Sequence, residues 1–157
     1  MVSRKRVIGR AAQGGITYLG VLLLIAVLSA GLAKVGEVWR TAAQREKEKQ
    51  LLHIGEQYRQ AIGRYYRQSP GVPRYPSKLE ELVKDSRFLE TRRHIRRLYP
   101  DPMTGKEWGL VRGPDGGIMG IYSQSTAPPL KIGGFPDHQR GFADKPRYSE
   151  WKFVPPQ

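Results

Sequence analysis

The sequence predicts an α+β fold in which a long N-terminal α-helix packs on a small antiparallel β-sheet, with one short additional helix. Three observations support this class. An uncharged run over residues 11–33 continues, without a proline, into a stretch with helical spacing of apolar residues. Two β-like segments flank a strong turn signal at Asp115-Gly116. A third segment, residues 148–154, alternates polar and apolar side chains.

The composition limits which kinds of site the protein can contain and which classes of partner it is expected to bind. The chain of 157 residues has a formal net charge of +13 and contains no cysteine. A disulfide scaffold and cysteine-ligated zinc or iron–sulfur sites are therefore excluded. An excess of positive charge of this size is typical of proteins that meet nucleic acid, a membrane surface or an acidic partner.

The uncharged segment has the length of a membrane span. Its 23 residues, 11–33, would form a helix of roughly 34 Å, against a hydrocarbon core of about 30 Å. Basic residues precede it, so the positive-inside rule keeps the N-terminus in the cytoplasm and exports the rest. A cleaved secretory signal has a similar start, and Gly31 and Ala33 offer small residues for a cut after Ala33. An uncleaved anchor is the simpler interpretation of these features.

One helix is expected over residues 16–68. Helix formers of mixed charge occupy residues 42–50, and an apolar stripe at helical spacing follows. Such stripes normally pack in a core, and three prolines within residues 69–76 end the helix. The stripe consists of Leu51, Ile54, Tyr58, Ala61, Ile62 and Tyr65.

A short helix is expected over residues 77–85. Ser77 and Glu80 form a capping-box pattern at its start. The expected buried positions of this helix and of the segment that follows it are Leu79, Leu82, Val83, Leu89, Ile95 and Leu98.

The C-terminal part is expected to be β-rich. Residues 107–111 and 117–122 should form a hairpin around the Asp-Gly turn. In the expected strand 148–154, Ser149, Trp151 and Phe153 lie on the buried face. The 25 residues 123–147 form a loop, and a loop of this length is usually functional or held by other contacts.

Two sets of residues resemble a known family. The segment Gly15-Ile16-Thr17-Tyr18-Leu19 resembles the cleavage region of type IV pilin-like proteins, in which a basic leader ends in Gly before a long apolar helix. The later segments YPSKLEEL (75–82), LYPDPMTGKEWGLV (98–111) and GGIMGIYS (116–123) are similar to the globular part of the major pseudopilin of type II secretion systems. The two parts occur in that family's order and cover most of the chain, which implies a pilin-like version of the α+β fold.

The resemblance implies a path of processing and assembly. A prepilin peptidase would cut between Gly15 and Ile16, and the mature helix would anchor the protein in the bacterial inner membrane with its C-terminal domain in the periplasm. Other pilin-like subunits and an inner-membrane assembly platform would be the partners in a type II secretion or type IV pilus-like filament. The implied parts are a leader (1–15), a transmembrane or filament-core half-helix (16–33), an amphipathic half-helix (34–68) and a globular α+β domain (69–157). The implied assembly residues are Thr17, Leu19, Gly20, Leu22 and Leu23.

The fifth mature position departs from the family pattern. The family has Glu there, and its carboxylate is thought to meet the N-terminal amine of a neighbouring subunit, whereas this sequence has Gly20. A lone amine in an apolar bundle is costly unless it is paired. Some minor pseudopilins, notably tip subunits, also lack the Glu, so a minor or specialised subunit is expected.

The C-terminal loop also departs from the family. Major pseudopilins usually bind calcium there, but the acids of this loop are only Asp137 and Asp144. Calcium takes about six to eight oxygen ligands, so no cofactor is expected, and a calcium site in this loop is the less favoured alternative. Packing of Trp108 or Trp151, together with the prolines, is expected to order the loop instead.

No catalytic pattern is present in the sequence. His53, His94 and His138 have no metal-ligand partner at short spacing, and His53 is expected to be a surface or packing residue. Residues 113–117 are glycine-rich but lack the Lys and Ser/Thr of a phosphate-binding loop. No serine lies in a G-x-S-x-G setting, so an enzyme is not expected.

An arginine cluster leaves a second function open. Clusters of this kind usually form a solvated basic face. The alternative is that this cluster contacts an acidic subunit or DNA, and its affinity for DNA would then fall steeply with salt. No interleaved aromatic residues support single-strand stacking. The alternative function is a non-assembling, membrane-anchored binding module for DNA or an acidic envelope partner. The cluster consists of Arg87, Arg92, Arg93, Arg96 and Arg97, of which the last four are the expected contacts.

Overall fold

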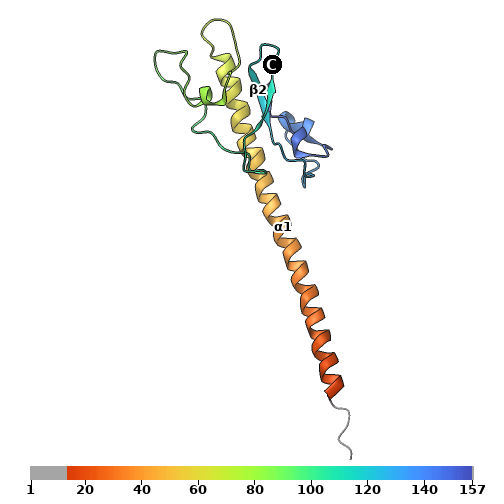
Figure 1. The fold of residues 1–157 in the computed structure, drawn as a ribbon. Coiled ribbons are helices and arrows are strands. Elements are labelled where there is room, and N and C mark those ends of the chain that lie inside the picture. The colour runs from red at the N-terminus through yellow and green to blue at the C-terminus, as the bar shows by residue number, and fades with distance from the viewer. Residues whose placement is uncertain (1–13, 157) are drawn as a thin grey trace, which may run out of the picture. The chain divides into compact units, whose positions relative to one another are not determined.

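The structure is a computed structural model that describes the backbone of residues 14–156 and the side chains of residues 18–29 and 36–156. The chain forms two compact units, one ending at Ala42 and the other beginning at Ala43. Helix α1 (Gly14–Arg67) contributes residues to both (Figure 1). The predicted helix over residues 16–68 is confirmed. Arg64 and Arg67 lie in its last turn, where cations complement the helix dipole.

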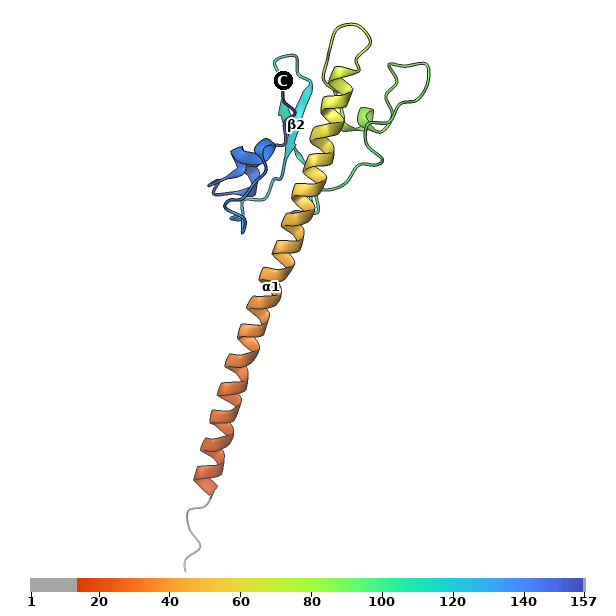
Figure 2. The ribbon, with the colours of Figure 1, turned by 180° about the vertical axis from the view of Figure 1, so that it is seen from behind.

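The second unit contains all the remaining elements. The 3-10 helix η1 (Leu79–Leu82) follows the proline-rich link, and strands β1 (Gly109–Arg112) and β2 (Ile118–Tyr122) form a two-stranded antiparallel sheet. Two further 3-10 helices, η2 (Asp137–Phe142) and η3 (Tyr148–Glu150), complete the chain. In this unit, Figures 1 and 2 place the hairpin and the C-terminal segment on one side of α1 and η1 on the other. The α+β class with a small antiparallel sheet is confirmed.

The predicted hairpin is also confirmed. Gly109 pairs with Tyr122, and Arg112 pairs with Ile118 after an irregularity in the register. Gly116 has a φ of 77°, a left-handed conformation that glycine adopts without steric cost. The glycine-rich segment 113–117 is therefore a turn.

The core of the second unit lies against one face of α1. Leu51, Tyr58 and Tyr65 are at most 2% exposed, which confirms that the stripe packs in the core. Full burial of a large apolar side chain contributes about 1.5–3 kcal/mol. The opposing core side chains include Leu82, Ile95, Trp108, Ile118, Ile121, Phe142, Tyr148, Trp151 and Phe153.

The predicted capping box is absent. The residue before η1 is Lys78, which is extended and makes no side-chain cap bond. The helix is short because the carbonyl of Leu82 accepts hydrogen bonds from the backbone amides of His94 and Ile95, at 2.8 and 3.1 Å. Leu82 is fully buried, as predicted, while Leu79 and Val83 are partly buried against the core.

The segment after η1 differs from the prediction at two of its three expected core positions. Ile95 is buried, but Leu89 is fully exposed and Leu98 is 37% exposed. Asp85 pairs with Arg92 in an isolated bridge, which makes residues 86–91 a loop outside the core. The prediction that Leu89 and Leu98 are buried is therefore wrong.

The predicted strand 148–154 does not form. The amide of Trp151 donates to the carbonyl of Tyr148, which curls the chain into η3, and only Phe153 pairs with Ile121. Trp151 and Phe153 are nevertheless buried, as the alternation indicated, while Ser149 is only partly buried.

Residues 123–147 are ordered partly by an aromatic cluster. Trp151 stacks on Phe142 with 5.3 Å between ring centroids, and Phe135 and Tyr148 meet its ring edge-on. Trp151 thus orders this segment as predicted. Trp108 has a different role, because its ring packs against Tyr58 of α1.

We expect Gly55→Ala to lower the free energy of unfolding by about 1–3 kcal/mol, because a new Cβ would overpack the core. That Cβ would lie 2.4 Å from ring atoms of Phe153. Urea unfolding of the full chain in detergent, followed by tryptophan fluorescence, measures the change. Gly141→Ala is the control, since its new Cβ has no atom within 4 Å, and we expect it to change stability by less than about 0.5 kcal/mol. Equal stability of the two variants would contradict the packing described here.

Candidate functional site

The predicted processing site lies at the start of α1. Gly15, Ile16 and Thr17 belong to the first turn of the helix, and their side chains lie outside the described residues. Residues 1–13, which make up most of the predicted basic leader, lie outside the described residues as well.

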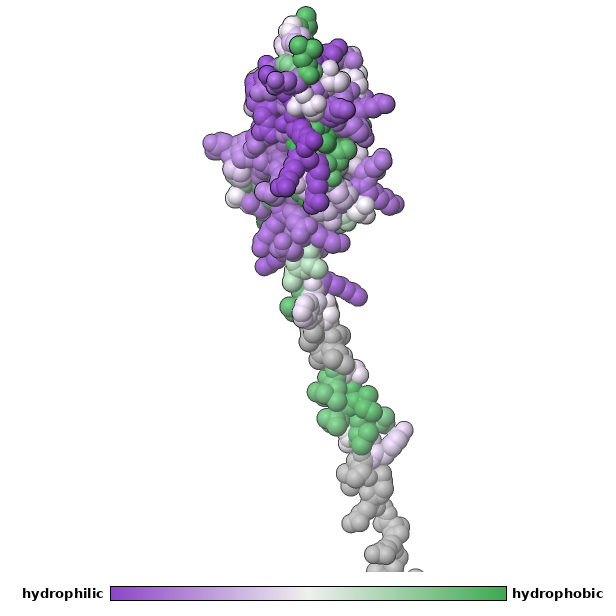
Figure 3. Space-filling view, turned by 90° about the vertical axis from the view of Figure 1, so that its left-hand side faces the viewer, coloured by the Kyte–Doolittle hydropathy of each residue, from purple (hydrophilic) through white to green (hydrophobic). Residues whose placement is uncertain are grey.

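The predicted assembly residues on α1 are exposed. Leu19, Leu22 and Leu23 are 69%, 45% and 68% exposed, and an added Cβ at Gly20 would have nothing within 4 Å. Figure 3 shows apolar side chains gathered on the N-terminal unit. Among the side chains that the structure describes, no helix is both long and apolar enough to cross a membrane.

The exposed apolar residues surround the helix. Val21, Leu22, Leu23, Leu24 and Ile25 are consecutive, and each is at least 45% exposed. Because successive residues of an α-helix point about 100° apart, these side chains cover every side of it. A helix that is apolar all round requires apolar surroundings.

The predicted arginine cluster divides into two parts. Arg92, Arg93, Arg96 and Arg97 are exposed, and among the described residues none of them forms an ion pair. Arg87 differs, because its side chain is only 6% exposed and its guanidinium donates to both carboxylate oxygens of Asp85. Arg87 is therefore not part of a solvated face.

Asp85 is the centre of a buried polar network that the sequence did not reveal. Its side chain is fully buried, and Arg87 Nη2 and His94 Nε2 lie 2.7 and 2.9 Å from its Oδ2. The Arg87 guanidinium lies 3.4 Å from the ring centroid of Tyr65, whose hydroxyl donates to Glu81. Asp85 lies two positions before Arg87, so the sequence could have indicated this ion pair, but His94 and Tyr65 come from other segments of the chain.

The network shifts the ionisation of its members. Burial by itself would raise the pKa of Asp85, but hydrogen bonds from Arg87 and His94 outweigh it and hold the pKa well below its usual value. Burial and the hydrogen bond to Glu81 raise the pKa of Tyr65. Asp85 is therefore charged and Tyr65 neutral at pH 7, and together they fix the base of the 86–91 loop.

The acids of the C-terminal segment do not converge. Asp137 is exposed and pairs with Arg140 at 2.7 Å, and Asp144 adopts a left-handed φ of 57°. Within the described part of the chain, no group of three or more His, Asp or Glu side chains is placed to hold a metal ion.

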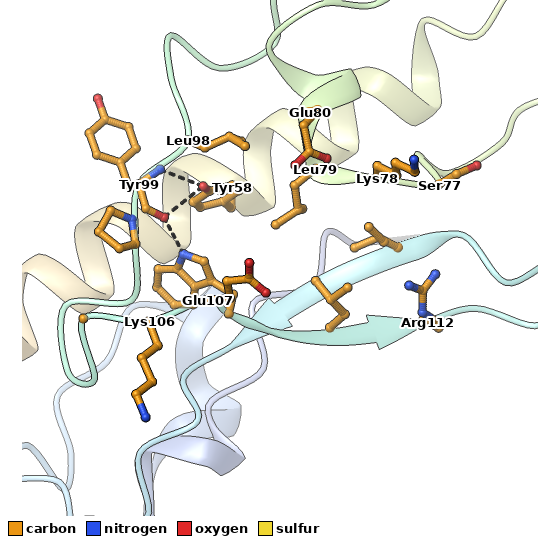
Figure 4. A pocket seen from close by; sticks show the side chains of 15 residues that line it. Tyr58, Ser77, Lys78, Leu79, Glu80, Leu98, Tyr99, Lys106, Glu107 and Arg112 are labelled. Atoms are coloured by element: carbon orange, nitrogen blue, oxygen red, sulfur yellow. Dashed lines mark hydrogen bonds between the residues drawn. The ribbon is translucent and has the colours of Figure 1, made fainter.

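A cleft of about 480 Å³ opens between α1, η1, β1 and the segment around Tyr99 (Figure 4). The Tyr58 hydroxyl donates to the Tyr99 carbonyl at 3.1 Å and accepts from the Tyr99 amide at 2.9 Å. Trp108 Nε1 donates to the same carbonyl at 2.7 Å, so one wall of the cleft is firmly held. The apolar lining consists of Leu79, Leu98, Trp108, Leu110 and Ile118.

Charged side chains border the cleft. Lys78 and Arg112 lie toward one end and Lys106 toward the other, with Glu80 and Glu107 between them (Figure 4). The border therefore carries three cations and two carboxylates, and it surrounds an apolar floor. This arrangement suits an apolar side chain that is flanked by charged groups.

Comparison with known proteins finds no match: no family model fits the chain, and neither the curated proteins nor the solved structures contain one that is significantly similar.

We expect Asp85→Asn to lower the free energy of unfolding by about 3 kcal/mol at pH 7, because it leaves Arg87 buried without its counter-charge. The pKa of Asp85 is depressed in the folded state, so its contribution is present above the unfolded value of 3.8 and is lost as pH falls below it. The gap between wild type and variant should therefore shrink below about pH 4. Urea unfolding at several pH values measures it.

Glu90→Gln is the matched control for this experiment. Glu90 is exposed and lies in the loop that the network supports. We expect its substitution to leave stability within about 0.5 kcal/mol of wild type. A gap between Asp85→Asn and wild type that stays constant from pH 7 to pH 3 would show that the charge of Asp85 does not stabilise the fold.

Proposed function

We propose that this protein is a structural subunit of a pilin-like filament in a type II secretion or type IV pilus-like system. The observation that carries the proposal is the helix at residues 18–28, which is apolar on every side and exposed in the chain. Lipid before assembly, and the helices of other subunits after it, would supply the apolar surroundings that this surface needs. The α+β class of the second unit and the cleavage-like segment before the helix also support the proposal.

In this proposal the residues of α1 have separate roles. Gly15 and Ile16 form the site that a prepilin peptidase cuts, and Ile16 becomes the mature N-terminus. Residues 16–33 anchor the protein in the bacterial inner membrane and later pack in the filament core. The second unit lies in the periplasm. The work of the protein is mechanical and involves no bond chemistry.

Gly20 distinguishes the proposed subunit from the family pattern, which has Glu at this position. Without a carboxylate at this position, the subunit cannot neutralise the N-terminal amine of a neighbour within the apolar bundle. A subunit with this defect suits a place where few such contacts are made, such as the end of a filament. We therefore propose a minor subunit.

The N-terminus of the mature protein tests the proposal. We expect intact mass and N-terminal peptide mapping to find a start at Ile16 when prepilin peptidase is present and at Met1 when it is absent. Gly15→Val should prevent the cut, because a branched side chain would replace the small residue before the cut bond, whereas Ala12→Val, three positions earlier, should not. A start at Lys34, or an uncut Met1 with the peptidase present, would contradict it.

A second candidate function is a membrane-anchored binding module that does not assemble. The observation in its favour is the group Arg92, Arg93, Arg96 and Arg97, which is exposed and without ion pairs among the described residues. Such a group would bind the phosphates of DNA or an acidic envelope protein. Its affinity for DNA would fall steeply with salt, since phosphate contacts release counterions.

Gly20→Glu discriminates between the two functions. A filament subunit should assemble as well as wild type or better, because the new carboxylate can pair with a neighbour's amine. A simple anchor would carry an unpaired carboxylate in lipid at a cost of about 3 kcal/mol, and less of it should remain in the membrane. The measurement is the share of the protein in sheared filaments and in washed membranes.

Gly36→Glu is the control for this substitution. Gly36 also lies on α1 with nothing within 4 Å of an added Cβ, but it follows the apolar segment. We expect this variant to behave as wild type in both fractions. A loss of Gly20→Glu protein from the membrane without any gain in filaments would favour the binding module.

A further inference from the structure

Leu89 is an apolar side chain that the fold holds in solvent. It is the most exposed large hydrophobic residue that the structure describes. The loop that carries it is closed at its base by a hydrogen bond of 2.9 Å from the Asp85 amide to the Arg92 carbonyl. The buried Asp85 network lies directly beneath this closure. The position of Leu89 is thus supported by buried contacts.

The residue before Leu89 is also fixed. The ring of Phe88 lies close to two guanidinium groups, with Arg92 4.1 Å and Arg87 5.8 Å from its centroid. Phe88 therefore has packing partners within the chain, while the side chain of Leu89 is available to pack against another molecule. Glu90 follows Leu89 and is exposed. The loop presents one apolar side chain with one carboxylate beside it, and the exposed side chains of Arg92 and Arg93 follow.

The cleft beside Tyr58 has the complementary features. Its floor is apolar, and Leu98 and Leu79 remain partly exposed to it. Lys78 and Arg112 lie toward one end, where a carboxylate would be attracted, and Glu80 and Glu107 lie between them and Lys106 (Figure 4). Its volume of about 480 Å³ is ample for a leucine side chain and its neighbours.

We propose that the cleft binds the Leu89–Glu90 loop of a second copy of this chain. Leu89 would bury its side chain on the apolar floor, and Glu90 would pair with Lys78 or Arg112. The contact joins two different surfaces, so it repeats from copy to copy and builds a ring or an open helical array. Its place in a filament rests on the proposed function, but the contact itself does not.

Site-directed cross-linking of the full chain in membranes tests the contact, because the protein has no cysteine of its own. Thr91→Cys places a thiol beside the loop, and Ser77→Cys places one at the cleft, and both positions are exposed. Two differently tagged copies, one with each cysteine, are joined with a short bismaleimide. We expect a mixed dimer at several times the yield obtained when Thr126→Cys, which lies outside the cleft, replaces Ser77→Cys.

Substitutions in the same background test the two parts of the contact. Leu89→Asp should reduce the mixed dimer to the control level, whereas Ile132→Asp, at another exposed apolar residue, should not. Glu90→Lys should lower the yield about 2- to 5-fold, as expected for an exposed ion pair, and Lys78→Glu should restore it. A mixed dimer no more abundant than the control, or one that survives Leu89→Asp, would overturn the proposal.

The same samples separate this proposal from the proposed function. A mature chain that starts at Ile16 but gives no mixed dimer above the control would refute the contact and leave the filament subunit in place. A strong mixed dimer on a chain that keeps Met1 in the presence of peptidase would support the contact and refute the pilin-like pathway.

Discussion

The buried face of α1 is the constraint on which the second unit depends. This unit has only two short strands and three short 3-10 helices, so it has little regular structure to pack together. Residues of α1 from Leu51 to Tyr65 supply one straight, rigid wall, and the hairpin, η1 and the C-terminal aromatic cluster all reach the same core. Gly55 shows how close the contact is, because the Phe153 ring occupies the space where a Cβ would stand.

Buried carboxylates fasten the irregular segments to this wall. Glu48 accepts from the amides of Leu130 and Lys131 and from the Tyr148 hydroxyl, and so ties the C-terminal loop to α1. Asp101 instead ties the segment before β1 to the residues that follow β2, accepting from four donors that include the Ser123 hydroxyl. Burying a carboxylate is costly unless it is fully hydrogen-bonded. Every buried side-chain nitrogen and oxygen in the described part of the chain has a partner.

The sequence predicts what local patterns determine and misses what distant contacts determine. Helix α1 and the hairpin follow from the spacing of apolar residues and from one Asp-Gly turn, both of which are local signals. Residues 148–154 alternate like a strand, yet the chain curls there into η3, with Tyr148 held by Glu48. At the candidate site, the exposure of the apolar helix was predictable from the sequence. The burial of Arg87, which separates it from the exposed arginines, depends on Asp85, His94 and Tyr65, and these come together only in the fold.

The two units satisfy their apolar surface in opposite ways. The second unit buries its large side chains in one core, whereas the described apolar residues of the first have no partner in the chain. The part of α1 in the second unit is stabilised by its own domain, whereas the part in the first unit is stabilised only by lipid or by other helices. In the second unit, Leu89 is the most exposed of several large apolar side chains that remain in solvent, which include Val72 and Ile132. The buried ionic network at the base of its loop holds Leu89 in water, and the proposed contact with a second copy would bury that side chain.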